Sequence, residues 1–102
     1  MRTYELSSAA EKDLRDIVQY TAERWGTAQV RKYTQTLEQC AAKLAAGQGY
    51  YKLVSDLYPN MRVIHCQHHY IFGVMRENAP MLIVAILHER MDIITQLENR
   101  LK

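Results

Sequence analysis

The side chains best suited to chemistry lie in the second half of the sequence, and they are Arg62, Arg76, His88, Glu89 and Arg90. Guanidinium groups hold phosphate oxygens and stabilise negative charge in a transition state. An imidazole or a carboxylate can accept and donate protons. Such a set can bind an anionic partner or move a proton at a bound phosphate. The structural alternative for the last three residues is a buried strand that ends in a polar loop.

A second cluster of chemically capable residues is the segment His65-Cys66-Gln67-His68-His69. Imidazole and thiolate groups are zinc ligands, and a structural zinc site takes four of them. Strand alternation places His65 and His69 on one face and Cys66 on the other, and the sequence has no Cys-x-x-Cys pair. We therefore expect a half-exposed strand and turn here, with no metal and no other cofactor.

Length and composition predict one folded domain over residues 1–102, because 48% of the residues are hydrophobic and 24% are charged. A net charge of +2 is too small to indicate direct nucleic-acid binding. The apolar run Met81–Leu87 is far shorter than the roughly 18 residues that a membrane span needs, and the first residues lack a signal-peptide pattern. We expect a cytoplasmic protein without membrane contact. Its two cysteines, Cys40 and Cys66, should then be reduced thiols, with Cys40 filling the apolar face of a helix.

The first residues predict a short strand followed by a helix. Alternation over Arg2–Leu6 indicates the strand. Ser8 and Glu11 have the spacing of a capping box, so we expect the helix to begin there. Gly26 fits the position at which this helix ends.

A second amphipathic helix is expected over about Thr27–Ala46, with Gly47 ending it. Because almost no linker separates the two helices, they must fold back as an antiparallel hairpin. We expect Tyr20 and Trp25 to close that hairpin rather than to bind a ligand.

The second half of the sequence predicts a sheet and a last helix. We expect a loop over 48–60, strands over 61–66, 69–76 and 81–88, and a turn at Glu77–Pro80. Asp92 can cap the last helix, which has Ile94, Leu97 and Leu101 on one side. The predicted fold is α+β: an N-terminal strand, a helical hairpin packed on a mainly antiparallel sheet, and a short C-terminal helix.

An ordered set of residues over nearly the whole chain resembles the ParE/RelE superfamily of bacterial toxin–antitoxin toxins, and the ParE branch in particular. The set consists of Tyr4-x-Leu6, Ala10-x-x-Asp13-Leu14-x-x-Ile17-x-x-Tyr20, Trp25-Gly26-x-x-Gln29, Tyr33-x-x-x-Leu37, Arg62, His69-Tyr70-Ile71-Phe72 and Ile86-Leu87-His88-x-Arg90-x-Asp92. The fold that the resemblance implies agrees with the one predicted from the pattern.

The resemblance implies one of two activities, since one fold can serve different targets. ParE-like toxins bind DNA gyrase and trap it on cleaved DNA without being enzymes. The surface that this resemblance suggests for gyrase is the open side of the sheet, with Arg62, Arg76, His88 and Arg90, together with the C-terminal segment. The alternative is a RelE-like messenger RNA endoribonuclease, in which Arg62, Arg76 and His88 would act on the phosphate and Glu89 would be the base. No lysine lies between Lys52 and Lys102, and the His88-x-Arg90-x-Asp92 ending is of the ParE kind, so we favour gyrase.

The resemblance also implies a partner, a cognate antitoxin whose flexible C-terminal region folds on the toxin, and a higher-order complex of the two. The apolar side of the last helix, formed by Ile94, Leu97 and Leu101, is the surface we expect it to cover. The alternative is that this side packs on the protein's own sheet.

Overall fold

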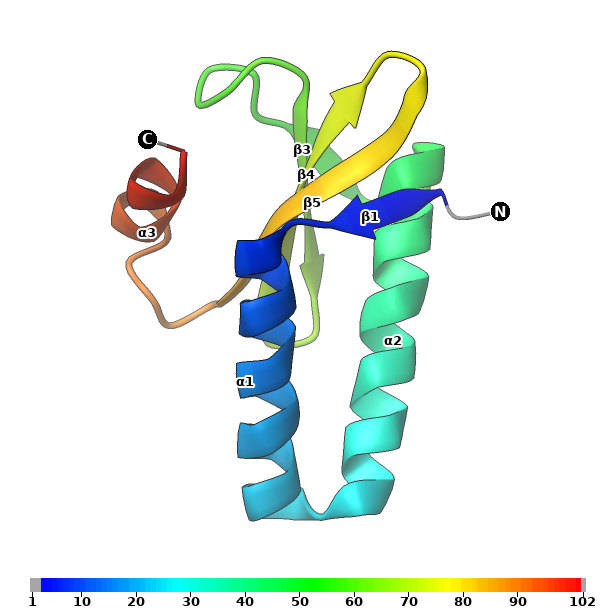
Figure 1. Ribbon diagram of the computed structural model, residues 1–102, viewed down its shortest axis with the longest axis vertical. Coiled ribbons are helices and arrows are strands. Elements are labelled where there is room, and N and C mark those ends of the chain that lie inside the picture. The colour runs from blue at the N-terminus through cyan, green and yellow to red at the C-terminus, as the bar shows by residue number, and fades with distance from the viewer. Residues whose placement is uncertain (1–2, 102) are drawn as a thin grey trace.

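The computed structural model describes residues 3–101, which form eight elements around one sheet (Figure 1). In chain order the elements are β1 (Tyr4–Leu6), α1 (Ser8–Trp25), α2 (Thr27–Ala46), β2 (Tyr51–Leu53), β3 (Met61–Cys66), β4 (His69–Arg76), β5 (Ala79–His88) and α3 (Ile93–Arg100). The strand order is β1-β5-β4-β3-β2, with β1 parallel to β5 and the other neighbours antiparallel. The predicted α+β fold is confirmed.

The α1–α2 hairpin has its ends where backbone chemistry requires them. Ser7, not Ser8, caps α1: its hydroxyl accepts a hydrogen bond from the Ala10 N–H at 3.1 Å, so the predicted cap was one residue late. Gly26 separates the helices with φ 87°, and Gly47 ends α2 in the left-handed conformation with φ 72°. Both conformations favour glycine, which is why the hairpin turns and ends at these residues.

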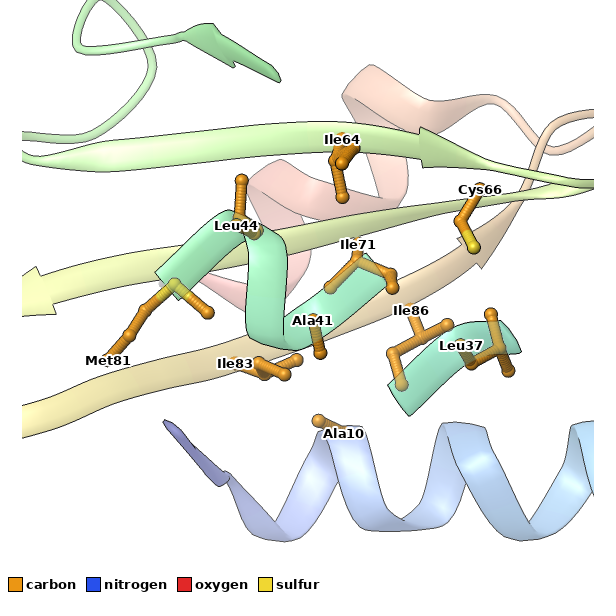
Figure 2. Close-up of a cluster of buried hydrophobic side chains, with 10 residues drawn as sticks. All are labelled: Ala10, Leu37, Ala41, Leu44, Ile64, Cys66, Ile71, Met81, Ile83 and Ile86. Carbon is orange, nitrogen blue, oxygen red and sulfur yellow. The ribbon is translucent and has the colours of Figure 1, made fainter. Parts of the chain in front are cut away.

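One face of the sheet packs against the helical hairpin (Figure 2). The helices contribute Ala10, Leu37, Ala41 and Leu44, and the strands contribute Ile64, Cys66, Ile71, Met81, Ile83 and Ile86. The other face packs against α3 through a second cluster, formed by Met61, Phe72, Ala85, Leu87 and Leu97. Since β5 carries buried residues on both faces, its apolar run is that of a strand covered on both sides.

Two boundaries differ from the sequence prediction. The region expected to be a loop contains β2, because Tyr51–Leu53 pair with Arg62–Ile64 of β3. β5 begins at Ala79, before the expected Met81, and Pro80 lies inside the strand. Among the described residues, no helix is long and apolar enough to cross a membrane.

Candidate functional site

The cationic residues predicted as one surface lie at two opposite ends of the sheet. Register pairs Cys66 with His69 and His69 with His88, so His88 lies at the end of β3 that is distant from Arg62. Cys66 lies four positions after Arg62 in β3, which is about 13 Å of strand. Arg62 and His88 therefore cannot act on one phosphate in this conformation.

Arg62 is engaged at the C-terminal end of α2. Its Nη1 donates a hydrogen bond to the Leu44 carbonyl at 2.9 Å, and its guanidinium carbon lies 4.9 Å from the centre of the Tyr51 ring. The Gly47 N–H also bonds this carbonyl, so Arg62 is its second donor, and the cation opposes the negative end of the helix dipole. The buried Nε of Arg62 has no partner among the described residues. These contacts make Arg62 a structural residue.

Arg76 is engaged at the start of β5. Its Nε donates to the Pro80 carbonyl at 2.8 Å, and its Nη2 lies 3.0 Å from a carboxylate oxygen of Glu5. The carboxylate belongs to β1, so Arg76 connects the hairpin turn of β4 and β5 to the first strand.

The β3–β4 turn brings all of the chain's histidines together at the other end of the sheet, against α2. His69 lies opposite both Cys66 and His88 in the ladder, so His69 and Cys66 share a face. The predicted alternation was wrong here, because the chain reverses at Gln67 (φ 57°) and His68 instead of continuing as one strand. Gln67 adopts the left-handed backbone conformation that the turn needs.

His69 is held against α2 by Tyr33. The His68 N–H donates to the Tyr33 hydroxyl at 3.2 Å, and that hydroxyl is also hydrogen-bonded to the Nδ1 of His69. Burial, together with the neighbouring His88 and His68, lowers the pKa of His69 to about 4. Burial also raises the pKa of the Tyr33 hydroxyl. His69 is thus neutral at physiological pH.

Glu89 completes the cluster on the surface. One of its carboxylate oxygens lies 3.6 Å from the Nε2 of His65 and 3.7 Å from the Nδ1 of His68. His88 uses its Nδ1 to accept a hydrogen bond from the Arg90 N–H at 3.0 Å. No group of three or more candidate metal ligands occurs within residues 3–101.

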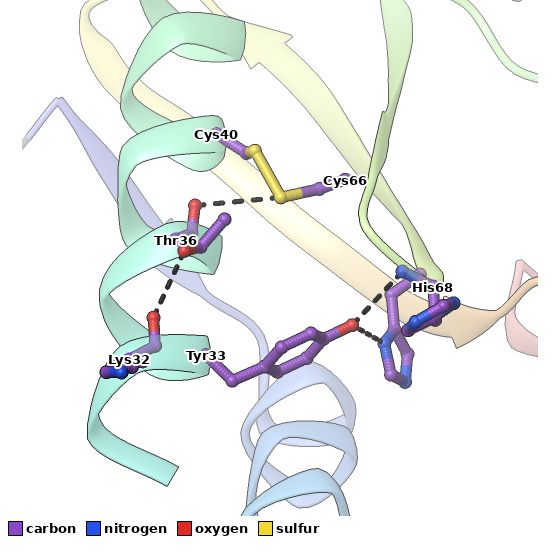
Figure 3. Close-up of a disulfide and its surroundings, with 7 residues drawn as sticks. Lys32, Tyr33, Thr36, Cys40, Cys66 and His68 are labelled. Atoms are coloured by element: carbon purple, nitrogen blue, oxygen red, sulfur yellow. Dashed lines mark hydrogen bonds between the residues drawn. A yellow bond between two sulfur atoms is a disulfide. The ribbon is translucent and has the colours of Figure 1, made fainter. Parts of the chain in front are cut away.

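Cys40 and Cys66 form a disulfide that joins α2 to β3, with their Cα atoms 6.3 Å apart (Figure 3). The expectation of two free thiols was therefore wrong. The two cysteines lie 26 residues apart in the sequence, and only the packing of the hairpin on the sheet brings them into contact. The bond fixes α2 to the sheet about two helical turns from Tyr33, which contacts His69.

The C-terminal helix is already packed on the protein's own sheet. Leu97 is 1% exposed and belongs to the second core cluster, and Leu101 packs against that cluster. Ile94, by contrast, is 50% exposed. Of the three residues predicted to contact an antitoxin, only Ile94 has a largely exposed side chain. Packing on the protein's own sheet, which was the alternative, applies to Leu97 and in part to Leu101.

An ion pair that the sequence patterns did not reveal connects α3, α1 and the edge of β5. Arg100 donates two hydrogen bonds to the Asp13 carboxylate, at 2.9 and 3.1 Å, and a third to the Val84 carbonyl at 2.8 Å. The Asp13 carboxylate also accepts the Ile86 N–H at 3.0 Å. The β1 register ends at Ile83, so these two side chains take the place of a strand beyond it.

The residues predicted to close the helical hairpin do not do so. Trp25 is 68% exposed and Tyr20 is 55% exposed. The guanidinium of Arg24 lies 5.4 Å from the centre of the Tyr20 ring. The hairpin is closed instead by Gly26, which needs no apolar contact to turn.

The order of elements and the two-sided sheet define an α+β domain, with a helical hairpin on one face of a mixed sheet and a short helix on the other. A solved structure, "Chromosomal ParDE TA system from P. aeruginosa", superposes with a TM-score of 0.68, covering 86% of this chain and 96% of that one at 17% identity, which shows the shared fold. The model of the family "ParE toxin of type II toxin-antitoxin system, parDE" matches residues 4–93. The chain belongs to this ParE toxin family.

Individual relatives agree with this assignment. The chain is 53% identical to "Toxin ParE" of Escherichia coli over 102 residues, which is 100% of this chain and 99% of the relative. It is 29% identical to "Toxin ParE1" of Mycobacterium tuberculosis over 90 residues, or 88% of this chain and 92% of the relative. The predicted resemblance to the ParE branch is confirmed.

Proposed function

We propose that this toxin acts in the cytoplasm by binding DNA gyrase and stabilising its cleaved complex with DNA, without catalysing a reaction of its own. The observation that carries the proposal is the match to a ParE toxin over the full length of the chain. The activity needs an exposed protein-binding surface rather than a set of acid–base groups.

The geometry of the cationic residues also favours gyrase binding over the ribonuclease alternative. A ribonuclease needs a proton-transfer group and a phosphate-binding cation on one substrate. The Arg62 guanidinium instead contacts the end of α2, and Arg76 is bonded to Pro80 and Glu5. His88 and Glu89 lie at the opposite end of the sheet.

Of the predicted target-binding residues, we keep His88 and Arg90 as candidates for contact with gyrase. Arg90 is exposed, and His88 is half-buried beside it. Arg62 and Arg76 contact other parts of the protein at the opposite end of the sheet, so substitutions there serve as controls. Arg90→Ala should weaken gyrase poisoning more than Arg76→Ala, in proteins that melt within a few degrees of the wild type.

The neutralising partner in this proposal is an antitoxin, because the solved relative from P. aeruginosa is a ParDE toxin–antitoxin system. Ile94 and the neighbouring Met91, which are 50% and 49% exposed, offer apolar area on and before α3. The complex and its stoichiometry are tested by co-expression with a candidate antitoxin, followed by light scattering on the purified complex.

The deciding experiment is a gyrase assay with purified toxin. Supercoiling should fall and linear, cleaved DNA should accumulate, and the antitoxin should reverse both effects. A translation extract receiving the same toxin should retain intact messenger RNA. Cut messages with unchanged gyrase activity would instead establish the ribonuclease.

A further inference from the structure

The hairpin tip, which comprises Tyr20–Lys32, projects beyond the sheet (Figure 1). Tyr33 contacts the β3–β4 turn through His69, and the six residues that precede it in α2 extend about 9 Å further at 1.5 Å per residue. Every residue from 22 to 29 is exposed. A Cβ added to Gly26 would meet no atom within 4 Å, so the space beside this residue of the turn is open.

Two aromatic side chains at the tip contribute little to the protein's own core. Trp25 is 68% exposed and Tyr20 is 55% exposed, whereas core side chains such as Leu37 and Leu44 are at most 3% exposed. Tryptophan, tyrosine and arginine are the residues most enriched among the energetically dominant contacts of protein interfaces. Trp25, Tyr20 and Arg24 supply all three types within one and a half helical turns.

The charge of the tip indicates the kind of partner. Its cations are Arg24, Arg31 and Lys32, and its one anion is Glu23. Three cations, interrupted by a carboxylate, are too few for the basic stripe that DNA binding by the tip itself would need. They complement a protein surface on which carboxylates surround an apolar recess.

We propose that the hairpin tip is the surface by which this toxin engages its target protein, with the Trp25 indole seated in an apolar recess of the target and Arg24, Arg31 and Lys32 facing carboxylates around it. The inference rests on the proposed function and deepens it, because it names the contact site on the toxin for the gyrase complex. His88 and Arg90 lie at the same end of the sheet as the tip, whereas Arg62 and Arg76 lie at the other end.

The test compares Trp25→Ala with Tyr50→Ala. Tyr50 is 101% exposed and follows the opposite end of α2, so its variant controls for the loss of an exposed aromatic ring. The readouts are colony formation on induction, gyrase cleavage with purified protein, affinity for the antitoxin and thermal melting. Trp25→Ala should lose roughly 30-fold or more in gyrase poisoning, the scale of an interface residue of this type. It should keep the wild-type melting temperature and antitoxin affinity, and Tyr50→Ala should behave as wild type.

A second variant tests the charges. Arg31→Glu together with Lys32→Glu reverses two exposed cations, and this variant should poison gyrase more weakly, chiefly through a slower association rate. The difference from wild type should shrink as the salt concentration rises.

The outcomes separate this inference from the proposed function. If the wild type poisons gyrase and Trp25→Ala does so equally well, the inference is wrong and the proposed function stands. If the wild type is toxic but leaves gyrase unaffected, while Trp25→Ala is not toxic, the gyrase proposal is wrong and the tip is still the target contact.

Equal losses in gyrase poisoning and antitoxin affinity would make the tip an antitoxin surface, and a loss of binding to free duplex DNA would make it a nucleic-acid contact. Either result overturns the inference.

Discussion

The Asp13–Arg100 pair gives the sharpest test of how the C-terminal helix is held. The two side chains are 15% and 23% exposed and share two hydrogen bonds, and each also bonds a backbone group of β5. Arg100→Ala removes three hydrogen bonds and leaves the Asp13 carboxylate mostly buried without its cation. A fully buried pair broken in this way costs about 3–5 kcal/mol, and partial exposure reduces that range. We expect Arg100→Ala to lower the free energy of unfolding by about 2–3 kcal/mol.

The assay is a double-mutant cycle in urea, with Arg100→Met, Asp13→Asn and the double variant. Residues in direct contact show coupling energies of about 0.5–3 kcal/mol, and we expect a value above about 1 kcal/mol here. The matched control is the exposed Lys12–Asp16 pair, whose side chains are 72% and 64% exposed. An exposed pair at this helical spacing is worth only a few tenths of a kcal/mol. If the Asp13 and Arg100 substitutions are simply additive, the claim that the pair replaces a strand at the edge of β5 is refuted.

Three further predictions follow from the packing. Reduction of the Cys40–Cys66 disulfide, which closes a 26-residue separation, should lower the free energy of unfolding by about 3.5 kcal/mol in the chain-entropy account, measured as urea curves with and without dithiothreitol. Leu97→Ala should cost about 2–4 kcal/mol because Leu97 is 1% exposed, whereas Ile94→Ala, at 50% exposure, should cost under about 1 kcal/mol. Unfolding free energy should also fall as the pH drops from about 6.5 to 4, because the pKa of His69 is about 4 in the folded protein and about 6.5 in the unfolded chain, which therefore takes up the proton first.

A specific experimental result would contradict each of these three predictions. A disulfide that contributes nothing would leave the two urea curves superimposed, and Cys40→Ala should then be as stable as the oxidised protein. Equal losses for Leu97→Ala and Ile94→Ala would mean that α3 does not pack on the sheet in solution. For the pH prediction, His69→Gln should reduce the drop in stability between about pH 6.5 and 4, and an NMR titration of His69 with a midpoint above about 6 would contradict the depressed pKa.

The fold was largely predictable from the sequence because its signals are local. Hydrophobic periodicity separates the helices over 8–46 from the strands beyond Met61, and glycine residues mark the hairpin turn and the end of α2. β2 was missed because it has only three residues and two of them are exposed, so no alternation could reveal it. Its existence depends on pairing with β3, a contact that sequence patterns do not contain.

The candidate site was less predictable, because its parts come from distant positions. The sequence identified Arg62 and His88 by residue type, yet the register that separates them is a property of the assembled sheet. The Cys40–Cys66 bond and the Asp13–Arg100 pair join residues 26 and 87 positions apart. For Trp25 the sequence pattern gave the wrong environment: apolar spacing in α1 predicted a packed ring, but the ring is mostly exposed at the last helical turn.

The parallel pairing of β1 with β5 has a consequence for the order in which the fold can be completed. Tyr4–Leu6 precede both helices in the chain, whereas their partners, Met81–Ile83, follow both helices and three other strands. The sheet therefore cannot be completed until β5 has been synthesised, and contacts between distant positions form slowly. The hydrogen bonds from Arg100 to Asp13 and Val84 form later still, because α3 follows β5 in the chain. A chain that stops before Met81 lacks the pairing partner of β1, so its five-stranded sheet cannot be completed.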